Sequence, residues 1–260
     1  MKQNIFIAII SFMVLSFVLV QCTKDNTNEN YNNSKESLTL RSDISIGGEV
    51  QSPGCGLDDY VVNTACGNTE NVEKILVSPN GCNVKVSMDV KICWNIYATG
   101  EKYVVFSNLK WSLAPPYSFD CESWWLSLIM AQPGQQNQLL DEFETYIEQA
   151  FEDAYMTDYV TQLQLDCSLE TASAFFFKSP CTQRCSTGPS SIDEPFYTYT
   201  TPCADDGCCV QVTSYCVLDD GTVWKSGPTV EPISPCTNFH PVTCNKGYYP
   251  IGDCIDDGCN

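Results

Sequence analysis

Cysteine is the residue that most constrains the fold of this chain, which has 17 of them among 260 residues. Cysteine at this density predicts an exported protein held together by disulfides, because an oxidising compartment preserves those bonds. Zinc is disfavoured, because the closest cysteine spacings are Cys181-x3-Cys185 and the adjacent Cys208-Cys209, and because the chain has one histidine. We expect a disulfide framework whose pairing the spacing does not determine.

The N-terminus carries an export signal. Lys2 precedes an apolar run over 5–20 that only Ser11 and Ser16 interrupt. A charged start followed by a long apolar run is typical of a secretory signal, and we assign residues 1–21 to it. The run is shorter than the ~20 apolar residues of a spanning helix, although a retained signal anchor is the alternative.

The end of this run resembles the lipobox of bacterial lipoproteins, with Leu19-Val20-Gln21-Cys22. The resemblance implies that Cys22 is lipidated and becomes the mature N-terminus. The next four residues, Thr23-Lys24-Asp25-Asn26, are similar to the signal that sends some Bacteroidota lipoproteins to the outer face of the outer membrane. The resemblance therefore implies a lipid anchor in the outer membrane facing the cell exterior, with the periplasmic face as the alternative. Setting Cys22 aside leaves 16 cysteines, enough for eight disulfides.

Composition divides the rest of the chain into three parts. Residues 22–45 contain the lipidated Cys22 and an asparagine-rich stretch without apolar periodicity, which predicts a disordered tether. Residues 46–188 are expected to form an α+β domain, and residues 189–260 a cysteine-rich β module, with a Gly- and Ser-containing linker between them. Each side of the linker has eight cysteines, which permits two separately cross-linked modules.

The formal net charge of −19 limits the partners of the chain. Binding to nucleic acid or docking on anionic lipid needs a basic face, so we expect neither. The partners that we expect are the membrane, reached through the lipid anchor, and an outer-membrane protein or a glycan.

Periodicity predicts the main elements of the first domain. Apolar and polar residues alternate over 82–96, which predicts a strand with one buried face, and a loop containing Gly100 leads into a second strand that ends at Pro115-Pro116. Cys93 lies on the polar face, so a disulfide there is expected to bring another segment over that face. A segment opened by Pro133-Gly134 has the spacing of an amphipathic helix of about five turns. Its apolar positions are Leu139, Leu140, Phe143, Ile147, Ala150, Phe151, Ala154 and Tyr155.

The opposite side of this helix is acidic and has no Lys or Arg, which favours a face exposed to water. Its members are Asp141, Glu142, Glu144, Glu148, Glu152 and Asp153. The fold class that we predict is α+β, an antiparallel β-sheet with one long amphipathic acidic helix, followed by a disulfide-rich β module. After Gly227 the apolar content is too low for a core, so disulfides are expected to hold that tail.

Two patterns are candidate sites. Cys203-Ala-Asp-Asp-Gly-Cys208 recurs as Cys254-Ile-Asp-Asp-Gly-Cys259. A plain cysteine-bounded turn is one interpretation, and a calcium site is the other, with Asp205, Asp206, Asp256 and Asp257 as ligands. The second pattern is an aromatic cluster beside Cys121, which predicts either core packing or a contact surface for glycan or protein. Its members are Tyr117, Phe119, Trp124 and Trp125.

No catalytic sequence motif predicts an enzymatic reaction for this chain. GxSxG, HExxH and P-loop patterns are absent from the sequence, and His240 is expected to be a loop residue. We predict a non-catalytic, lipid-anchored protein without a cofactor, either an accessory subunit of an outer-membrane complex or a surface binding protein. The alternatives are a glycan hydrolase that uses a carboxylate pair and an adhesin stabilised by calcium.

Overall fold

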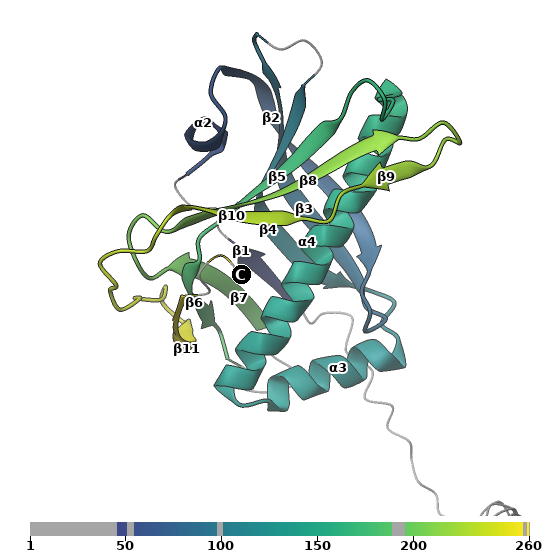
Figure 1. The fold of residues 1–260 in the computed structure, drawn as a ribbon. Coiled ribbons are helices and arrows are strands. Elements are labelled where there is room, and N and C mark those ends of the chain that lie inside the picture. Colours follow the sequence, from purple (N-terminus) through teal and green to yellow (C-terminus); the bar gives the residue numbers. More distant parts are fainter. Residues whose placement is uncertain (1–45, 51–54, 98–100, 189–195, 257–258, 260) are drawn as a thin grey trace, which may run out of the picture. The chain divides into compact units, whose positions relative to one another are not determined.

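The computed structural model describes residues 46–50, 55–97, 101–188, 196–256 and 259. The predicted signal, the lipid site Cys22 and the tether lie outside these residues. None of the helices that are described is long and apolar enough to span a membrane. The described chain has the predicted α+β fold, with eleven strands in one mostly antiparallel sheet (Figure 1).

Three strands form an antiparallel meander at one edge of the sheet. They are β2 (Thr64–Val77), β3 (Asn83–Asn95) and β4 (Lys102–Ala114). The predicted hairpin of β3 and β4 is confirmed, and the alternating apolar positions of β3 from Val84 to Val90 are buried. β4 ends where Pro115-Pro116 begins, because proline has no N–H with which to continue the ladder.

The sheet divides at the other edge of β4, and we call this division the fork. The first half of β4, Lys102–Phe106, pairs in parallel with β5 (Ala172–Lys178). The second half, Leu109–Ser112, pairs antiparallel with β1 (Ile46–Val50). Asn108 lies between the two halves with a φ of 53°, and its amide donates a 2.8 Å hydrogen bond to the Asp89 carboxylate of β3. This kink allows one strand to pair with two neighbours along the same edge.

Each neighbour of β4 begins a branch of the sheet. The β5 branch continues through β8 (Cys208–Val217) to β9 (Val223–Lys225) and β10 (Thr229–Ser234). The β1 branch continues through a parallel pairing with β7 (Phe196–Pro202), then β6 (Cys181–Ser186) and β11 (Tyr249–Asp256). The sheet is therefore mixed rather than purely antiparallel, because β1 pairs in parallel with β7 and β4 pairs in parallel with β5.

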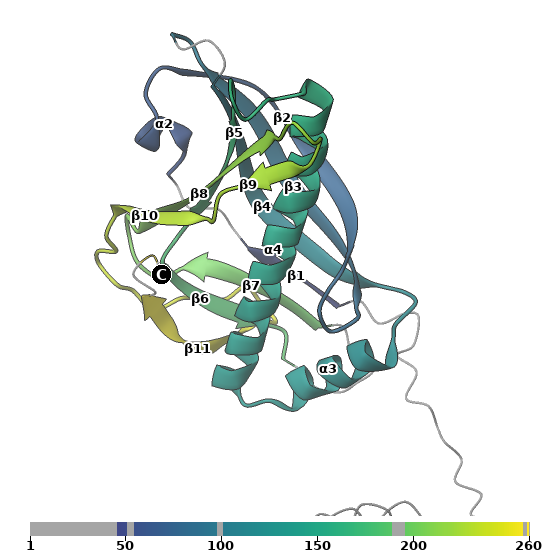
Figure 2. The same cartoon turned by 45° about the vertical axis from the view of Figure 1, so that its right-hand side comes forward.

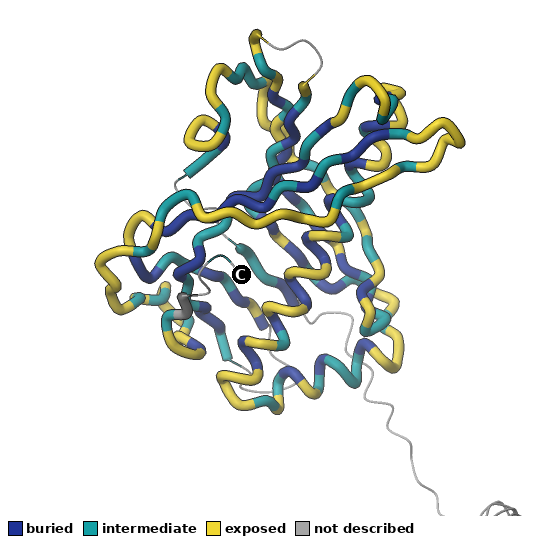
Figure 3. Tube along the Cα trace, in the orientation of Figure 1, coloured by how far each residue is buried: buried dark blue, intermediate teal, exposed yellow. Residues whose placement is uncertain are grey.

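Helices α3 (Phe119–Met130) and α4 (Pro133–Leu163) cover one face of the sheet, and the main hydrophobic core lies between them and the strands. α4 crosses both branches, and α3 precedes it (Figure 2). The apolar stripe of α4, including Leu140, Ile147 and Phe151, is buried against the sheet, and Figure 3 shows buried and exposed positions alternating along this helix. The short α2 (Leu57–Tyr60) packs a second, smaller cluster on the opposite face. The sheet is thus partly covered on both sides.

All eight predicted disulfides are present, and their pairing corrects the division at residue 188. Four of them join the two sides of that division, namely Cys55–Cys208, Cys167–Cys216, Cys181–Cys236 and Cys185–Cys244. Residues 46–188 and 189–260 therefore share one sheet and one set of cross-links rather than forming separately cross-linked modules. Cys93 bonds to Cys66, its register partner on β2, so this disulfide staples neighbouring strands instead of bringing a new segment over the face.

Candidate functional site

A pocket of about 210 Å³ lies at the fork, and we call it the fork pocket. Both branches and α4 contribute to it, because the two halves of β4 diverge beneath the helix. Its lining residues are Val50, Met88, Phe106, Ser107, Asn108, Leu109, Asp141, Glu144, Thr145, Glu148, Phe176, Phe177, Lys178, Ser179, Thr182, Arg184 and Thr200.

Strand register determines which residues of the β1 branch reach this pocket. Leu109 of β4 lies opposite Val50 of β1, and Val50 lies opposite Thr200 of β7. Thr200 in turn lies opposite Arg184 of β6. Side chains at paired positions project from the same face of a sheet, so this row places a hydroxyl and a guanidinium beneath α4.

Three glutamates of α4 face this row and its neighbours, which corrects the expectation of an acidic face in water. Glu144, Glu148 and Glu152 are buried, although Asp141 and Glu142 are exposed. The three buried acids each follow a residue of the apolar stripe and recur at four-residue spacing, so they share the edge of the stripe that meets the sheet. The helix itself has no cation, and the compensating residues come from strands that are distant in sequence.

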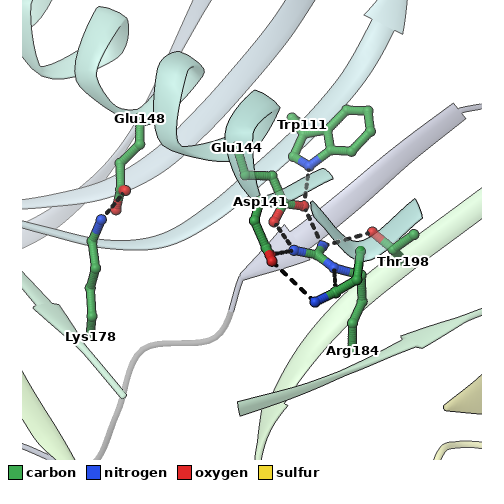
Figure 4. A network of polar contacts seen from close by, with 8 residues as sticks. Trp111, Asp141, Glu144, Glu148, Lys178, Arg184 and Thr198 are labelled. Carbon is green, nitrogen blue, oxygen red and sulfur yellow. Dashed lines mark hydrogen bonds and ion pairs between the residues drawn. The ribbon is translucent and has the colours of Figure 1, made fainter. Parts of the chain in front are cut away.

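Arg184 is the centre of the largest polar cluster in the pocket (Figure 4). Its side chain is 2% exposed, and its Nη1 and Nη2 donate to the two carboxylate oxygens of Glu144 at 2.8 and 2.7 Å. A second Nη2 bond reaches Asp141, Nε donates to the Asn137 side-chain oxygen at 3.0 Å, and Nη1 also donates to Thr198 at 3.4 Å. These five hydrogen bonds use all five N–H groups of the guanidinium.

The charge of Arg184 is fixed by this environment. Burial alone would lower the pKa of the guanidinium, but the carboxylates of Glu144 and Asp141 more than offset that effect and raise the pKa above its ordinary value. Glu144 also accepts a 2.9 Å hydrogen bond from Trp111 Nε1. Gly48 makes room for this arrangement, because a Cβ there would lie 2.6 Å from Trp111 Nε1 and 2.9 Å from the Thr198 hydroxyl.

The other two buried glutamates have partners on the β5 branch. Glu148 is paired with Lys178, which lies at the end of β5. Glu152 accepts a 2.8 Å hydrogen bond from the Tyr215 hydroxyl of β8 and has no cation partner among the described residues. Burial raises the pKa of Glu152, assisted by the charges of Asp153 and Glu148, although hydrogen bonds from Tyr215 and Thr213 oppose the rise.

One polar group in the fork pocket has no partner within the part of the chain that the structure describes. The hydroxyl of Thr200 is buried without a hydrogen bond to any described residue, and the residue as a whole is 7% exposed. A buried hydroxyl normally has at least one hydrogen-bond partner. The pocket thus combines saturated charge pairs with an unsatisfied hydroxyl.

Three members of the predicted aromatic cluster, Phe119, Trp124 and Trp125, lie on α3, and Tyr117 lies just before its cap. Ser118 caps α3 by accepting a hydrogen bond from the Cys121 N–H, and Cys121 is tied to Cys82. Trp125 is buried in the core, while Trp124 stacks on Phe143 of α4 with ring centroids 4.6 Å apart. Tyr117 also packs against the core and is half-buried.

Phe119 differs from the rest of this cluster, being 81% exposed at the start of α3. A contact role for the cluster stays a prediction, and Phe119 is the member whose ring is available for it. None of the four aromatic residues lines the fork pocket.

The first CADDGC segment lines a separate hollow of about 910 Å³ that includes Asp205, Asp206 and Asp59. Asp205 accepts a hydrogen bond from the Asn238 side chain, and Asp206 accepts one from the Thr237 hydroxyl, so both carboxylates contact the segment after β10. Asp206, not the glycine after it, has the positive φ, at 63°. No group of three potential metal ligands occurs among the residues that the structure describes.

The second CxDDGC segment is only partly described. Asp257 and the side chain of Asp256 lie outside the described residues, so calcium binding stays a prediction. The two segments are linked, because Cys203 bonds to Cys254. His240 is half exposed near Asp205, with 4.0 Å between its Nε2 and a carboxylate oxygen, and lies in a loop as expected.

No protein-family model, curated protein or solved structure matches this chain. The fork pocket is therefore the main basis for a proposal about function. Of its charged residues, Asp141, Glu144 and Glu148 were expected from the sequence only as members of a face exposed to water. No neighbouring residues in the sequence mark Arg184 and Thr200 as pocket residues, because their place in the pocket is set by strand pairing.

Proposed function

We propose that this chain is an exported, non-catalytic binding protein, anchored in the outer membrane through Cys22, and that the fork pocket is its ligand site. The observation that carries the proposal is that each carboxylate lining the pocket is already bonded to a cation. Acid–base catalysis needs a group that is free to exchange a proton with the substrate. A pocket of saturated pairs is better suited to hold a ligand than to transform it.

A glycan hydrolase is less well supported by the same pocket. Glu144 and Glu148 lie one helical turn apart and both line the pocket, so they are the two carboxylates to consider as a catalytic pair. In such enzymes one carboxyl group must be protonated to donate to the leaving group. Both carboxylates are instead bonded to cations, Glu144 to Arg184 and Glu148 to Lys178, so neither is placed as a free acid beside the pocket.

Export and anchoring are supported by the cysteines. Eight disulfides need an oxidising compartment to form and persist. The anchor itself rests on the lipobox-like residues before Cys22. On detergent phase separation, we expect the wild-type chain to enter the detergent phase and the Cys22→Ser variant to stay in the aqueous phase. Equal partitioning of the two proteins would contradict the lipid anchor.

Native mass spectrometry of the full chain, isolated in mild detergent from its own membranes, tests the ligand site. We expect one small-molecule adduct per chain on the wild type. Thr145→Trp places a large side chain on the exposed surface of α4 at the pocket and is expected to remove the adduct. Thr157→Trp is the matched control, because Thr157 is exposed on the same helix and does not line the pocket. An adduct that persists in Thr145→Trp, or no adduct on the wild type, would contradict the proposal.

A second candidate, an accessory subunit, is favoured by an exposed apolar tip where β2 begins and β3 ends. Val62 and Tyr97 are 73% and 78% exposed, with Ile96 and Trp94 beside them in sequence. Exposed apolar clusters of this kind are typical of protein contact surfaces. The same preparation tests this candidate, since a stoichiometric outer-membrane protein that is lost from a Val62→Ser/Tyr97→Ser variant would support a subunit role.

A further inference from the structure

The unpartnered hydroxyl of Thr200 indicates that something absent from the described chain bonds inside the fork pocket. Thr200 is 7% exposed, lines the pocket, and lies in the strand row that faces α4. Leaving such a group unsatisfied costs about 1–3 kcal/mol. A ligand that offers a hydrogen-bonding group at this position would remove that cost.

The charges around Thr200 argue against an ionic ligand. All five N–H groups of Arg184 are engaged, and both carboxylate oxygens of Glu144 accept hydrogen bonds from them. Lys178 is paired with Glu148. A carboxylate, phosphate or amine would have to compete with these pairs for its partner, whereas an uncharged ligand leaves the Arg184–Glu144 and Lys178–Glu148 pairs intact.

The remaining polar groups at the pocket are hydroxyls and one amide. Besides Thr200 they are Ser107, Thr145, Ser179, Thr182 and Asn108. A hydroxyl both donates and accepts, so a wall of hydroxyls suits a ligand that also carries several of them. The volume of about 210 Å³ equals that of about seven waters at ~30 Å³ each, which limits the ligand to a single small ring or a short chain.

We infer that the fork pocket binds a small, uncharged, polyhydroxylated molecule of the size of one sugar unit, with Thr200 as a hydrogen-bonding residue. This inference rests on the proposed function, because it names the ligand class of the same site. Phe106 and Phe176 are buried, so they supply an apolar wall rather than a stacking platform. Recognition of the ligand therefore depends on hydrogen bonds from the hydroxyl groups that line the pocket.

Isothermal titration of the full chain with two panels of probes tests the ligand class. The uncharged panel is glucose, galactose, mannose, fucose, N-acetylglucosamine and myo-inositol, and the charged panel is glycine, lysine, putrescine and glucose 6-phosphate. We expect saturable binding of at least one uncharged probe and none of the charged ones. Thr200→Val is expected to weaken that binding about 3- to 10-fold, the value of one hydrogen bond.

Thr201→Val is the matched control, because Thr201 is the next residue of β7 and points to the opposite face. Its affinity should equal that of the wild type. The melting temperature of Thr200→Val should equal or exceed that of the wild type, because the substitution removes a buried hydroxyl that has no partner among the described residues. Weaker binding by this variant would then not result from unfolding.

The possible results separate the two proposals. Binding of a charged probe alone would overturn the inference about ligand class and leave the binding function standing. Equal affinity of the wild type and Thr200→Val would overturn the role of Thr200. Failure of both panels would overturn the inference, and failure of both panels together with the absence of a native adduct would overturn the proposed function as well.

Discussion

Arg184 connects α4 to the β1 branch through bonds that depend on the shape of the guanidinium. Two parallel bonds to Glu144 need its planar fork, and the remaining N–H groups reach Asp141, Asn137 and Thr198. A lysine ammonium has three donors in a different geometry and would satisfy fewer of these acceptors. Removal of the cation would leave the Glu144 carboxylate buried without a counter-charge.

We predict that Arg184→Met lowers the free energy of unfolding by about 3–5 kcal/mol, the usual consequence of leaving one partner of a buried ion pair alone. Urea unfolding without reductant measures it. Lys85→Met is the control, because the Lys85–Glu73 pair is about half exposed and should contribute less than about 1 kcal/mol. Equal effects of the two substitutions would mean that the Arg184 cluster does not hold α4 to the sheet.

Gly48 is the residue that allows Trp111 and Thr198 to approach each other across β1. We predict that Gly48→Ala destabilises the fold by about 1–3 kcal/mol, because the added Cβ overlaps both side chains. Gly227→Ala provides the comparison, since no atom lies within 4 Å of a Cβ at that position. Thermal unfolding of the two variants side by side gives the difference, and a neutral Gly48→Ala would argue against the packing described here.

At the scale of elements, α4 brings its buried acids to both branches of the sheet. Glu144 and Glu148 bond to cations, but Glu152 bonds to the hydroxyl of Tyr215 and lies beside Asp153, which is paired with Lys225. Burial raises the pKa of Tyr215, assisted by the charge of Glu152, so this hydroxyl stays a donor. The Glu152 carboxyl is the least compensated of the three buried acids.

The pKa of Glu152 gives a pH dependence of stability whose sign follows from linkage. Because its pKa is raised in the folded protein, the folded state holds this proton more tightly than the unfolded state does. Its contribution to stability is therefore present below the ordinary pKa of 4.5 and is lost as the pH rises through the raised value.

Glu152→Gln should remove this loss, since the amide still accepts from Tyr215 and does not ionise. We predict that the stability of the variant relative to the wild type rises with pH above 4.5 and then levels off. Glu142→Gln, which removes an exposed acid of the same helix, is the matched control. Unfolding curves between about pH 4 and pH 8 compare the three proteins, and a flat difference for Glu152→Gln would refute the assignment.

The elements with local periodicity are the ones that the sequence predicts well. The β3–β4 hairpin and α4 follow from alternation and from three- and four-residue spacing, although α4 continues to Leu163, beyond the five turns expected. α3 has no counterpart among the elements predicted from periodicity, although Ser118 and the acids that follow it form an N-terminal cap signal.

The fork pocket depends on contacts that no local pattern encodes. Glu144 and Arg184 are 40 residues apart, and their pairing requires the register of β6 under α4. The sequence does contain one indication that these glutamates are buried. Each of them directly follows a residue of the apolar stripe, as in Phe143-Glu144 and Ile147-Glu148. An acid at that place lies at the boundary of the buried face, where a partner from the sheet can reach it.

At the scale of the whole molecule, disulfides fix the two branches to each other. Cys181–Cys236 and Cys185–Cys244 attach the segment after β10 to β6 of the other branch, and Cys55–Cys208 ties the segment before α2 to β8. The segment between β10 and β11 has few buried apolar residues, so these bonds restrain it in place of a core.

We predict that peptide mapping under non-reducing conditions recovers the four disulfides that cross residue 188. Removing one of them with Cys185→Ser/Cys244→Ser should cost about 2–5 kcal/mol. Cross-links confined to either side of residue 188 would contradict the shared framework.

The most direct test of the account is a crystal structure of the chain purified from its native membranes, with the density in the fork pocket as the measurement. We predict an ordered, uncharged, hydroxyl-bearing molecule that bonds to Thr200 Oγ1 while the Arg184–Glu144 and Lys178–Glu148 pairs stay intact. A pocket that holds only water in the wild type, or a ligand bound elsewhere, would contradict it.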